Sequence, residues 1–287
     1  MSFLDKIFAG CTGKSHKGSI THDGLDREFT LYVPRRYGEG HAVPLLINLH
    51  GYTSNAEEQM WYGDFRCIAD DENFLIVHPE GTVYDGKTHW NTGGWTPNST
   101  VDDLCFIDAL IEYLKQHYKI DPKRIYAAGM SNGGEMSYHL ACQLSDKIAA
   151  IASVAGSMTP ETFGGCAPTH PMPVMHLHGT KDSVVPYEGD KTATPIMKVL
   201  EYWANHNQCA IQPVITQIVN SNNIDGSTVE HFIWKGPVAS VEHFKIIGAD
   251  HTWPGTSIDL GGTNQDIDAS KEIWKFLKQY DLDGPRS

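Results

Sequence analysis

Short apolar or alternating runs are separated by amphipathic segments along most of the chain. The runs predict strands at residues 28–33, 45–49, 74–77, 125–128, 148–155, 174–177 and 244–247. Apolar residues spaced three and four apart predict helices at residues 58–72, 102–114, 134–144, 196–206 and 269–280. Residues 212–219 and 227–234 predict a hairpin before the last strand. This alternation predicts an α/β fold with a mostly parallel central sheet and helices on both faces.

The pentapeptide GMSNG at residues 129–133 stands between a predicted strand and a predicted helix. Its glycines permit a turn tight enough to expose the Ser131 hydroxyl above the sheet, which is typical of the nucleophile elbow of α/β-hydrolases. Ser157 also follows an apolar run and is a rival nucleophile. The strand, turn and helix around Ser131 favour that residue.

An acid and a base follow in the order that this fold requires. Asp182 comes just after the strand at 174–177, and His251 follows the strand at 244–247. A serine needs an imidazole to take its proton, and the imidazole needs a carboxylate to fix its tautomer. We therefore predict Ser131, His251 and Asp182 as nucleophile, general base and orienting acid. Asp190, which we expect to begin the helix through 196–206, is the alternative acid.

Three other polar residues lie near these positions in the sequence. Asp250 adjoins the predicted base, and the pair His176 and His178 lies on the strand before the predicted acid. His176 alternates with apolar residues, so we expect a core histidine there, whereas His178 is expected to crowd the site without acting.

Catalysis on an ester also needs two N–H donors for the oxyanion. The backbone of Asn132, directly after the nucleophile, supplies one. The strand at 45–49 ends in His-Gly-Tyr-Thr, which makes the N–H of Tyr52 the best second donor and that of Thr53 the next.

Seven segments in this order resemble one group of esterases. They are LHGYT, HPEGT, WNTGG, VDD, GMSNGGEMSYHLAC, HGTKDSVVPY and HTWPG, spread over about residues 20–277. The chain resembles the polyhydroxybutyrate depolymerase-like esterases, which are related to the feruloyl and acetylxylan esterases of carbohydrate esterase family one. The resemblance implies an α/β-hydrolase fold, a Ser131, Asp182 and His251 triad, Tyr52 and Asn132 as oxyanion donors, and ester hydrolysis without a metal or organic cofactor.

The resemblance also bears on the cysteines. Family members carry cysteines at the places of Cys142 and Cys166, which implies a disulfide between them. Cys209 matches another family position, but no cysteine follows it to complete a second bridge. The six cysteines fit neither a zinc pattern nor a C-x-x-C pair.

Aromatic loops are the candidates for substrate contact. Trp90 and Trp95 frame a loop rich in turn formers, and Trp253 lies two residues from the predicted base. We expect these three indoles, with Thr53, to flank the substrate, because ligands gather where loops leave the strands. The alternative is that the tryptophans pack their loops against the core.

Length and charge limit the remaining choices. The 287 residues suit one α/β-hydrolase domain, which we place at residues 20–287 after an N-terminal extension at 1–19. The 35 acidic and 22 basic residues give a net charge of −13, which argues against nucleic acid and anionic membranes as partners. The first residues lack a basic segment followed by an apolar core, so we predict a cytoplasmic location, with secretion as the alternative.

The sequence thus predicts a serine esterase for short-chain, acetyl or hydroxycinnamoyl esters or for hydroxybutyrate oligomers. The alternative enzyme is an intracellular thioesterase or S-formylglutathione hydrolase-like protein. A non-catalytic binding protein with the same fold is the other class. The complete Ser, Asp and His set argues against that class. The substrate is a small or polymer-derived ester in the leading interpretation, and the oligomeric state is left open.

Overall fold

The computed structural model describes residues 11–38, 40–258 and 261–286. Ten strands form one sheet in the order β1-β2-β4-β3-β7-β8-β9-β12-β11-β10. These strands are β1 (Lys14–His22), β2 (Leu25–Val33), β3 (Val43–Leu49), β4 (Leu75–Pro79), β7 (Ile120–Met130), β8 (Ala150–Val154), β9 (Val174–Gly179), β10 (Val214–Gln217), β11 (Thr228–Trp234) and β12 (Val241–Ile247). The six central strands, from β4 to β12, are parallel, and both flanks are antiparallel.

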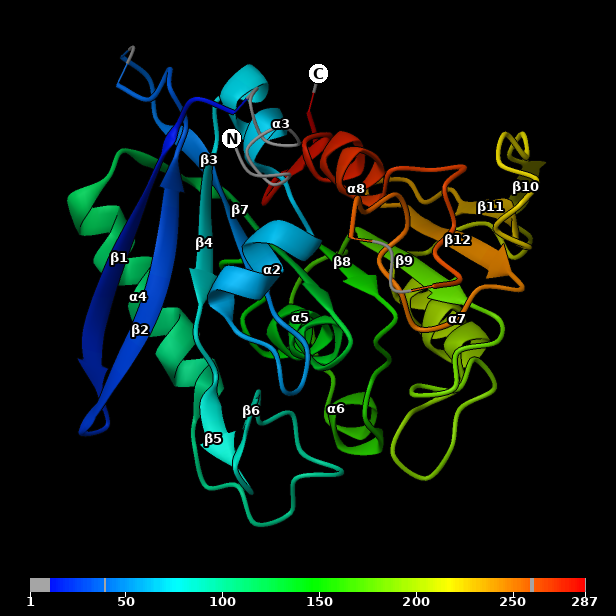
Figure 1. Cartoon of the computed structure of the whole chain (residues 1–287), viewed down its shortest axis with the longest axis horizontal. Coiled ribbons are helices and arrows are strands. Elements are labelled where there is room, and N and C mark those ends of the chain that lie inside the picture. The colour runs from blue at the N-terminus through cyan, green and yellow to red at the C-terminus, as the bar shows by residue number, and fades with distance from the viewer. Residues whose placement is uncertain (1–10, 39, 259–260, 287) are drawn as a thin grey trace.

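The helices lie on both faces of this sheet (Figure 1). They are α2 (Ala56–Tyr62), α3 (Arg66–Glu72), α4 (Asp103–His117), α5 (Asn132–Gln143), α6 (Pro160–Gly164), α7 (Ile196–His206) and α8 (Ala269–Leu277). Two small strand pairs, β5 (Thr82–Tyr84) with β6 (Lys87–His89) and β13 (Tyr280–Asp281) with β14 (Gly284–Pro285), complete the elements of the described residues. The fold is the predicted α/β-hydrolase arrangement of a mostly parallel sheet between helices.

Alternation along the central strands produces two cores. Leu45 and Ile47 of β3 face a core that includes α4, α5 and α7, whereas Leu46 faces a core that includes α3 and α8. Successive side chains of a strand point to opposite faces, so a strand covered on both sides is apolar throughout. The residues of β3 are all buried, as this requires.

Several element boundaries differ from the sequence prediction. The expected helix at 58–72 is two helices, because Gly63 ends α2 and packs where a side chain would collide with Gln59 and crowd Trp253. Helix α7 starts at Ile196 after Pro195, so Asp190 does not begin it. Asp190 instead accepts hydrogen bonds from Thr192 and Ala193 in a local turn.

The N-terminal boundary also needs correction. The predicted division after residue 19 falls inside β1, which pairs with β2 along its whole length from Lys14 to His22. A strand that shares a hydrogen-bond ladder with the sheet belongs to the same domain. The pattern of apolar residues does not indicate β1, because most residues of this strand are polar and exposed.

Two disulfides join parts of the chain. Cys142 and Cys166 form the expected bridge, which connects α5 to the loop after α6. Cys11 and Cys67 form a second bridge, a pairing that the sequence pattern does not indicate. Cys209, like Cys105, is free.

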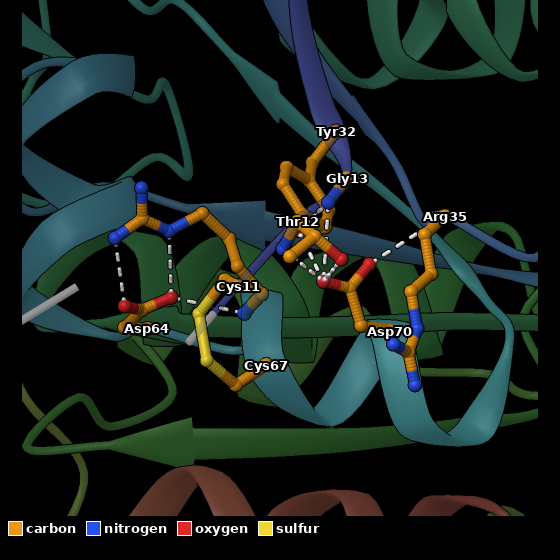
Figure 2. The surroundings of a disulfide bond; sticks show 9 residues. Cys11, Thr12, Gly13, Tyr32, Arg35, Asp64, Cys67 and Asp70 are labelled. Atoms are coloured by element: carbon orange, nitrogen blue, oxygen red, sulfur yellow. Dashed lines mark hydrogen bonds and ion pairs between the residues drawn. A yellow bond between two sulfur atoms is a disulfide. The ribbon is translucent and has the colours of Figure 1, made fainter. Parts of the chain in front are cut away.

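A buried carboxylate fixes the chain next to the second bridge (Figure 2). Asp70 on α3 accepts hydrogen bonds from the backbone N–H groups of Thr12, Gly13 and Arg35 and from the Tyr32 hydroxyl, at 2.6 to 3.1 Å. These donors hold the pKa of Asp70 below its usual range, although burial by itself would raise it. The segment that leads into β1 is therefore attached to α3 both covalently and by hydrogen bonds.

Candidate active site

Ser131 stands at the junction of β7 and α5 in a backbone conformation that few residues adopt. Its φ is 55° and its ψ is −119°, and it caps the N-terminus of α5. A Cβ on Gly129 would lie 2.4 Å from the backbone of Gly133, and one on Gly133 would lie 2.2 Å from the carbonyl oxygen of Leu49. Glycine is required on both sides of the serine, as in a nucleophile elbow.

His251 and Asp182 meet at the ends of two adjacent strands. The Nδ1 atom of His251 lies 2.7 Å from Oδ2 of Asp182, whose side chain is fully buried. The backbone N–H groups of Val184 and Val185 donate to the other carboxylate oxygen at 2.9 and 2.8 Å. Burial would raise the pKa of Asp182, but hydrogen bonds from His178 and His251 hold that pKa well below its usual range.

The imidazole of His251 faces the same cavity as Ser131. This cleft has a volume of about 600 Å³ and a mainly apolar wall. It is lined by Gly51, Tyr52, Ser54, Glu58, Gln59, Trp61, Tyr62, Met130, Ser131, His251 and Ile258. The hydrogen bonds of the described residues do not include one between Ser131 and His251; such contacts often tighten only when substrate binds.

The rival residues have other partners. Ser157 is buried and donates its hydroxyl hydrogen to the carbonyl of Thr194 at 2.6 Å. Asp250 accepts from Ser183 and from the backbone N–H of His251 rather than from its ring.

The two oxyanion candidates differ in how their N–H groups are used. The N–H of Thr53 donates to the carbonyl of Thr88 at 2.9 Å, whereas that of Tyr52 has no acceptor among the described residues. Tyr52 also lines the cleft beside Ser131. Of the two, only Tyr52 has a donor left for a substrate oxygen.

A buried network holds Asn132, the oxyanion donor that directly follows the nucleophile. Its side chain donates to the carbonyl of Trp90 at 3.1 Å and to Glu135 at 2.9 Å, and it accepts from the N–H of Trp90 at 2.7 Å. The Trp90 indole N–H donates in turn to the carbonyl of His50, in the loop that carries Tyr52. Sequence reasoning missed Glu135, a carboxylate whose pKa burial raises, because only the fold shows that the helix side on which it lies is buried.

The expected substrate contacts need correction. Trp90 and Trp253 are buried, with 0 % and 1 % of their surfaces exposed, so neither can stack on a ligand in this structure. Trp253 supports Tyr62, whose hydroxyl accepts the Trp253 backbone N–H at 3.0 Å. Trp95 lies behind Tyr52, with ring centroids 5.0 Å apart, and Thr53 is exposed outside the cleft.

The aromatic wall of the cleft comes instead from α2. Trp61 and Tyr62 end this helix, and Met130 faces them from the end of β7. The sequence pattern predicts a helix here and no contact with substrate. The one sequence feature that points to a place in the cleft is the position of this helix, directly after the loop that carries the oxyanion donor Tyr52.

Within the described residues, no cluster of three or more His, Cys, Asp or Glu side chains is arranged to hold a metal ion. The helices of the described part of the chain include none that is long and apolar enough to cross a membrane.

Comparison with known proteins places the chain in a family. Residues 37–212 match the family described as Phospholipase/Carboxylesterase. The chain belongs to this family. A bifunctional acetylxylan esterase/xylanase of Neocallimastix patriciarum is 29% identical over 267 residues, which are 92% of this chain and 35% of that protein. Feruloyl esterase B of Piromyces equi is 30% identical over 271 residues, 89% of this chain and 46% of that protein.

The chain thus spans about a third to a half of the length of these relatives. Among solved structures, an acetyl xylan esterase from Aspergillus awamori superposes with a TM-score of 0.61 at 14% identity, over 83% of this chain and 94% of that one. At this identity the likeness shows a shared fold.

Proposed function

We propose that this protein is a serine carboxylic ester hydrolase that works through an acyl-enzyme. The observation that carries the proposal is that a strained Ser131 lines the same cleft as His251, whose ring is held by a buried Asp182 carboxylate. Family membership and the esterase names of the relatives support the same reaction.

In this mechanism the Ser131 Oγ attacks the ester carbonyl carbon while Nε2 of His251 takes the hydroxyl proton. The negative charge that develops on the carbonyl oxygen is stabilised by the N–H groups of Tyr52 and Asn132. His251 then gives the proton to the alcohol oxygen that leaves. Water then attacks the acyl carbon while His251 takes a proton from it, and His251 returns this proton to the Ser131 Oγ as the bond to the acyl group breaks and the acid leaves. Asp182 keeps the proton of His251 on Nδ1 throughout, so that Nε2 stays free to accept.

We propose acetyl and hydroxycinnamoyl esters as the substrate class. The cleft volume lies within the range of sites for drug-sized ligands, and Trp61, Tyr62 and Met130 offer an apolar wall for a planar acyl group. The two relatives named for acetylxylan and feruloyl ester hydrolysis support this choice.

We infer that the protein works in an oxidising compartment, the alternative to the cytoplasmic location expected from the sequence. The support is the pair of disulfides, since such bonds form and persist outside the reducing cytosol. This inference favours an esterase over an intracellular thioesterase or S-formylglutathione hydrolase-like enzyme.

Single substitutions of the two serines test the proposal. Ser131→Ala should lower kcat on p-nitrophenyl acetate and methyl ferulate by at least about 10³ with an unchanged melting temperature. Ser157→Ala, which removes the rival hydroxyl, is the matched control and should retain most of the activity. If Ser131→Ala kept more than about a tenth of the wild-type turnover, the nucleophile would have to be sought elsewhere.

A panel of acyl chain lengths tests the substrate class. We expect kcat/KM for acetyl, butyryl and feruloyl esters to exceed that for palmitoyl esters. A preference for palmitoyl esters would mean that the proposed substrate class is wrong.

A further inference from the structure

We propose that His178 is a positioning residue for the Asp182 carboxylate and ends a buried chain of hydrogen-bond donors that begins at Tyr138 and passes through His176. The proposal rests on the proposed function in so far as Asp182 serves as the acid of the triad. It assigns a task to two buried histidines that the mechanism above does not use.

This donor chain runs without a gap from α5 to the loop after β9. The Tyr138 hydroxyl lies 2.8 Å from Nδ1 of His176, and Nε2 of His176 lies 3.1 Å from Nδ1 of His178. The Nε2 atom of His178 lies 2.8 Å from the carbonyl oxygen of Val185 and 3.2 Å from Oδ2 of Asp182. The side chains of His178 and Asp182 are fully buried, so water does not compete for these contacts.

The groups at the two ends of the donor chain determine which atom donates in each of its hydrogen bonds. Both groups beside Nε2 of His178 are oxygens that only accept, so this nitrogen must carry a hydrogen. At the other end, the Tyr138 hydroxyl has no acceptor besides His176 among the described residues, so it donates to Nδ1 of that ring. His176 therefore carries its hydrogen on Nε2 and donates to Nδ1 of His178. Both imidazoles are neutral and share the Nε2–H tautomer.

This chain completes the set of donors around the acid. Oδ1 of Asp182 accepts from two backbone N–H groups, and Oδ2 accepts from His251 and shares the N–H of His178 with Val185. A carboxylate held by four donors cannot rotate away from the base without losing several of them. The orientation of His251 thus depends on His178, which holds the carboxylate of Asp182.

Other titratable groups surround His178 and must be considered for any effect of pH. The Tyr187 ring lies edge-on to the His178 ring, with 5.9 Å between the ring centroids. Lys245 of β12 is the residue paired with His178 in the register of β12 and β9. His243 of β12 lies against His176 and hydrogen-bonds to the Tyr187 hydroxyl. Burial keeps the pKa of His176 and that of His243 low, so neither ring carries a positive charge at neutral pH. Asp182 is therefore the charged group in direct contact with His178 among the described residues.

Two substitutions of His178 separate positioning from packing. Glutamine can place an amide N–H where Nε2 lies, whereas leucine fills the space without a donor. We expect His178→Leu to lower kcat about 10-fold or more with little change in KM, because a hydrogen bond to a charged group is lost. His178→Gln should stay within about 3-fold of wild type.

The pH profile provides a readout that packing would not move. Without the His178 donor, the Asp182 charge acts more strongly on His251 and stabilises its protonated form. The acid limb of kcat/KM should therefore move to higher pH in His178→Leu and stay in place in His178→Gln. Equal activities and equal profiles for the two variants would overturn the proposal.

The tautomers can be measured on the wild-type protein, so a variant that fails to fold does not leave the question open. Long-range ¹H–¹⁵N spectra of histidine-labelled protein at neutral pH should show His176 and His178 protonated at Nε2 alone. His243 is the internal control, because its Nδ1 lies 3.0 Å from the His176 carbonyl and its Nε2 faces the Tyr187 hydroxyl, which requires the opposite tautomer. A hydrogen on Nδ1 of His178 would overturn the chain.

This measurement needs no substrate, so its failure is distinct from failure of the proposed function. If Ser131→Ala stayed active while the tautomers were as expected, the esterase mechanism would fall and the donor chain would stand. If Ser131→Ala were inactive while His178 carried a hydrogen on Nδ1, the esterase mechanism would stand and the donor chain would fall.

Discussion

Acidification should unfold this protein well above the pH at which most of its carboxylates protonate. Burial lowers the pKa of four buried histidines in particular: that of His50 to about 4, those of His78 and His243 to about 3, and that of His176 well below 6.5. In the unfolded chain each imidazole returns to a pKa near 6.5. Since the folded values are lower, the unfolded chain binds more protons below pH 6.5, and acid favours it.

The magnitude follows from the number of groups. One proton bound only by the unfolded state changes the free energy of unfolding by about 1.4 kcal/mol per pH unit, so four give a slope of about 5 kcal/mol per pH unit. Integrated from neutral pH down to pH 5, the loss is about 8 kcal/mol, which is comparable to the whole stability of an ordinary domain. The stabilisation of Asp182 is lost only at lower pH, because its pKa is held below the usual carboxyl range.

Urea titrations followed by tryptophan fluorescence at several pH values between about 7.5 and 5 measure this slope. His78 is the best single probe, because it is completely buried and burial lowers its pKa to about 3. His78→Leu should remove about one proton from the slope, whereas substitution of the exposed His16 by glutamine should remove none. A free energy of unfolding that is constant between about pH 7 and 5 would refute the assignment of neutral buried histidines.

Three further predictions concern the site and the disulfides. Asp182→Asn should lower kcat by about 10⁴. The position that faces two backbone N–H groups must remain an oxygen, so the asparagine amide turns its N–H₂ toward His251 and forces the wrong tautomer of that ring. Asp190→Asn should have little effect, and the reverse ranking would move the acid to Asp190. Trp61→Ala should raise KM for feruloyl esters more than for acetyl esters, measured beside Trp253→Phe as a packing control, and an equal change for both esters would remove Trp61 from the acyl site. Reduction of the two bridges, which span 56 and 24 residues, should lower stability by about 3 to 4 kcal/mol each in the chain-entropy model; mass mapping that finds free thiols would contradict both the bridges and the oxidising compartment.

The features that the sequence determined by itself are those with local causes. The turn at Ser131 was predictable because glycines and apolar residues next to it specify a strand, a sharp bend and a helix within a few positions. The start of α4 was predictable in the same way, since Asp102 accepts the N–H of Cys105 three residues later. The triad of Ser131, Asp182 and His251 could be predicted because each of these residues follows a strand that the local sequence indicates.

What tertiary structure decided is burial and the meeting of distant segments. An indole has the same local signature whether it packs inward, as Trp90 and Trp253 do, or lines a cleft, as Trp61 does, because the outcome depends on which element covers it. Cys11 pairs with Cys67 because the hydrogen bonds of β1 and of Asp70 bring them together across 56 residues. The donor chain behind Asp182 is decided in the same way, since Tyr138 on α5 reaches His176 on β9 only when the helix packs on the sheet. Sequence spacing indicates which residues are close along the chain, whereas these contacts join residues that become close only in the folded structure.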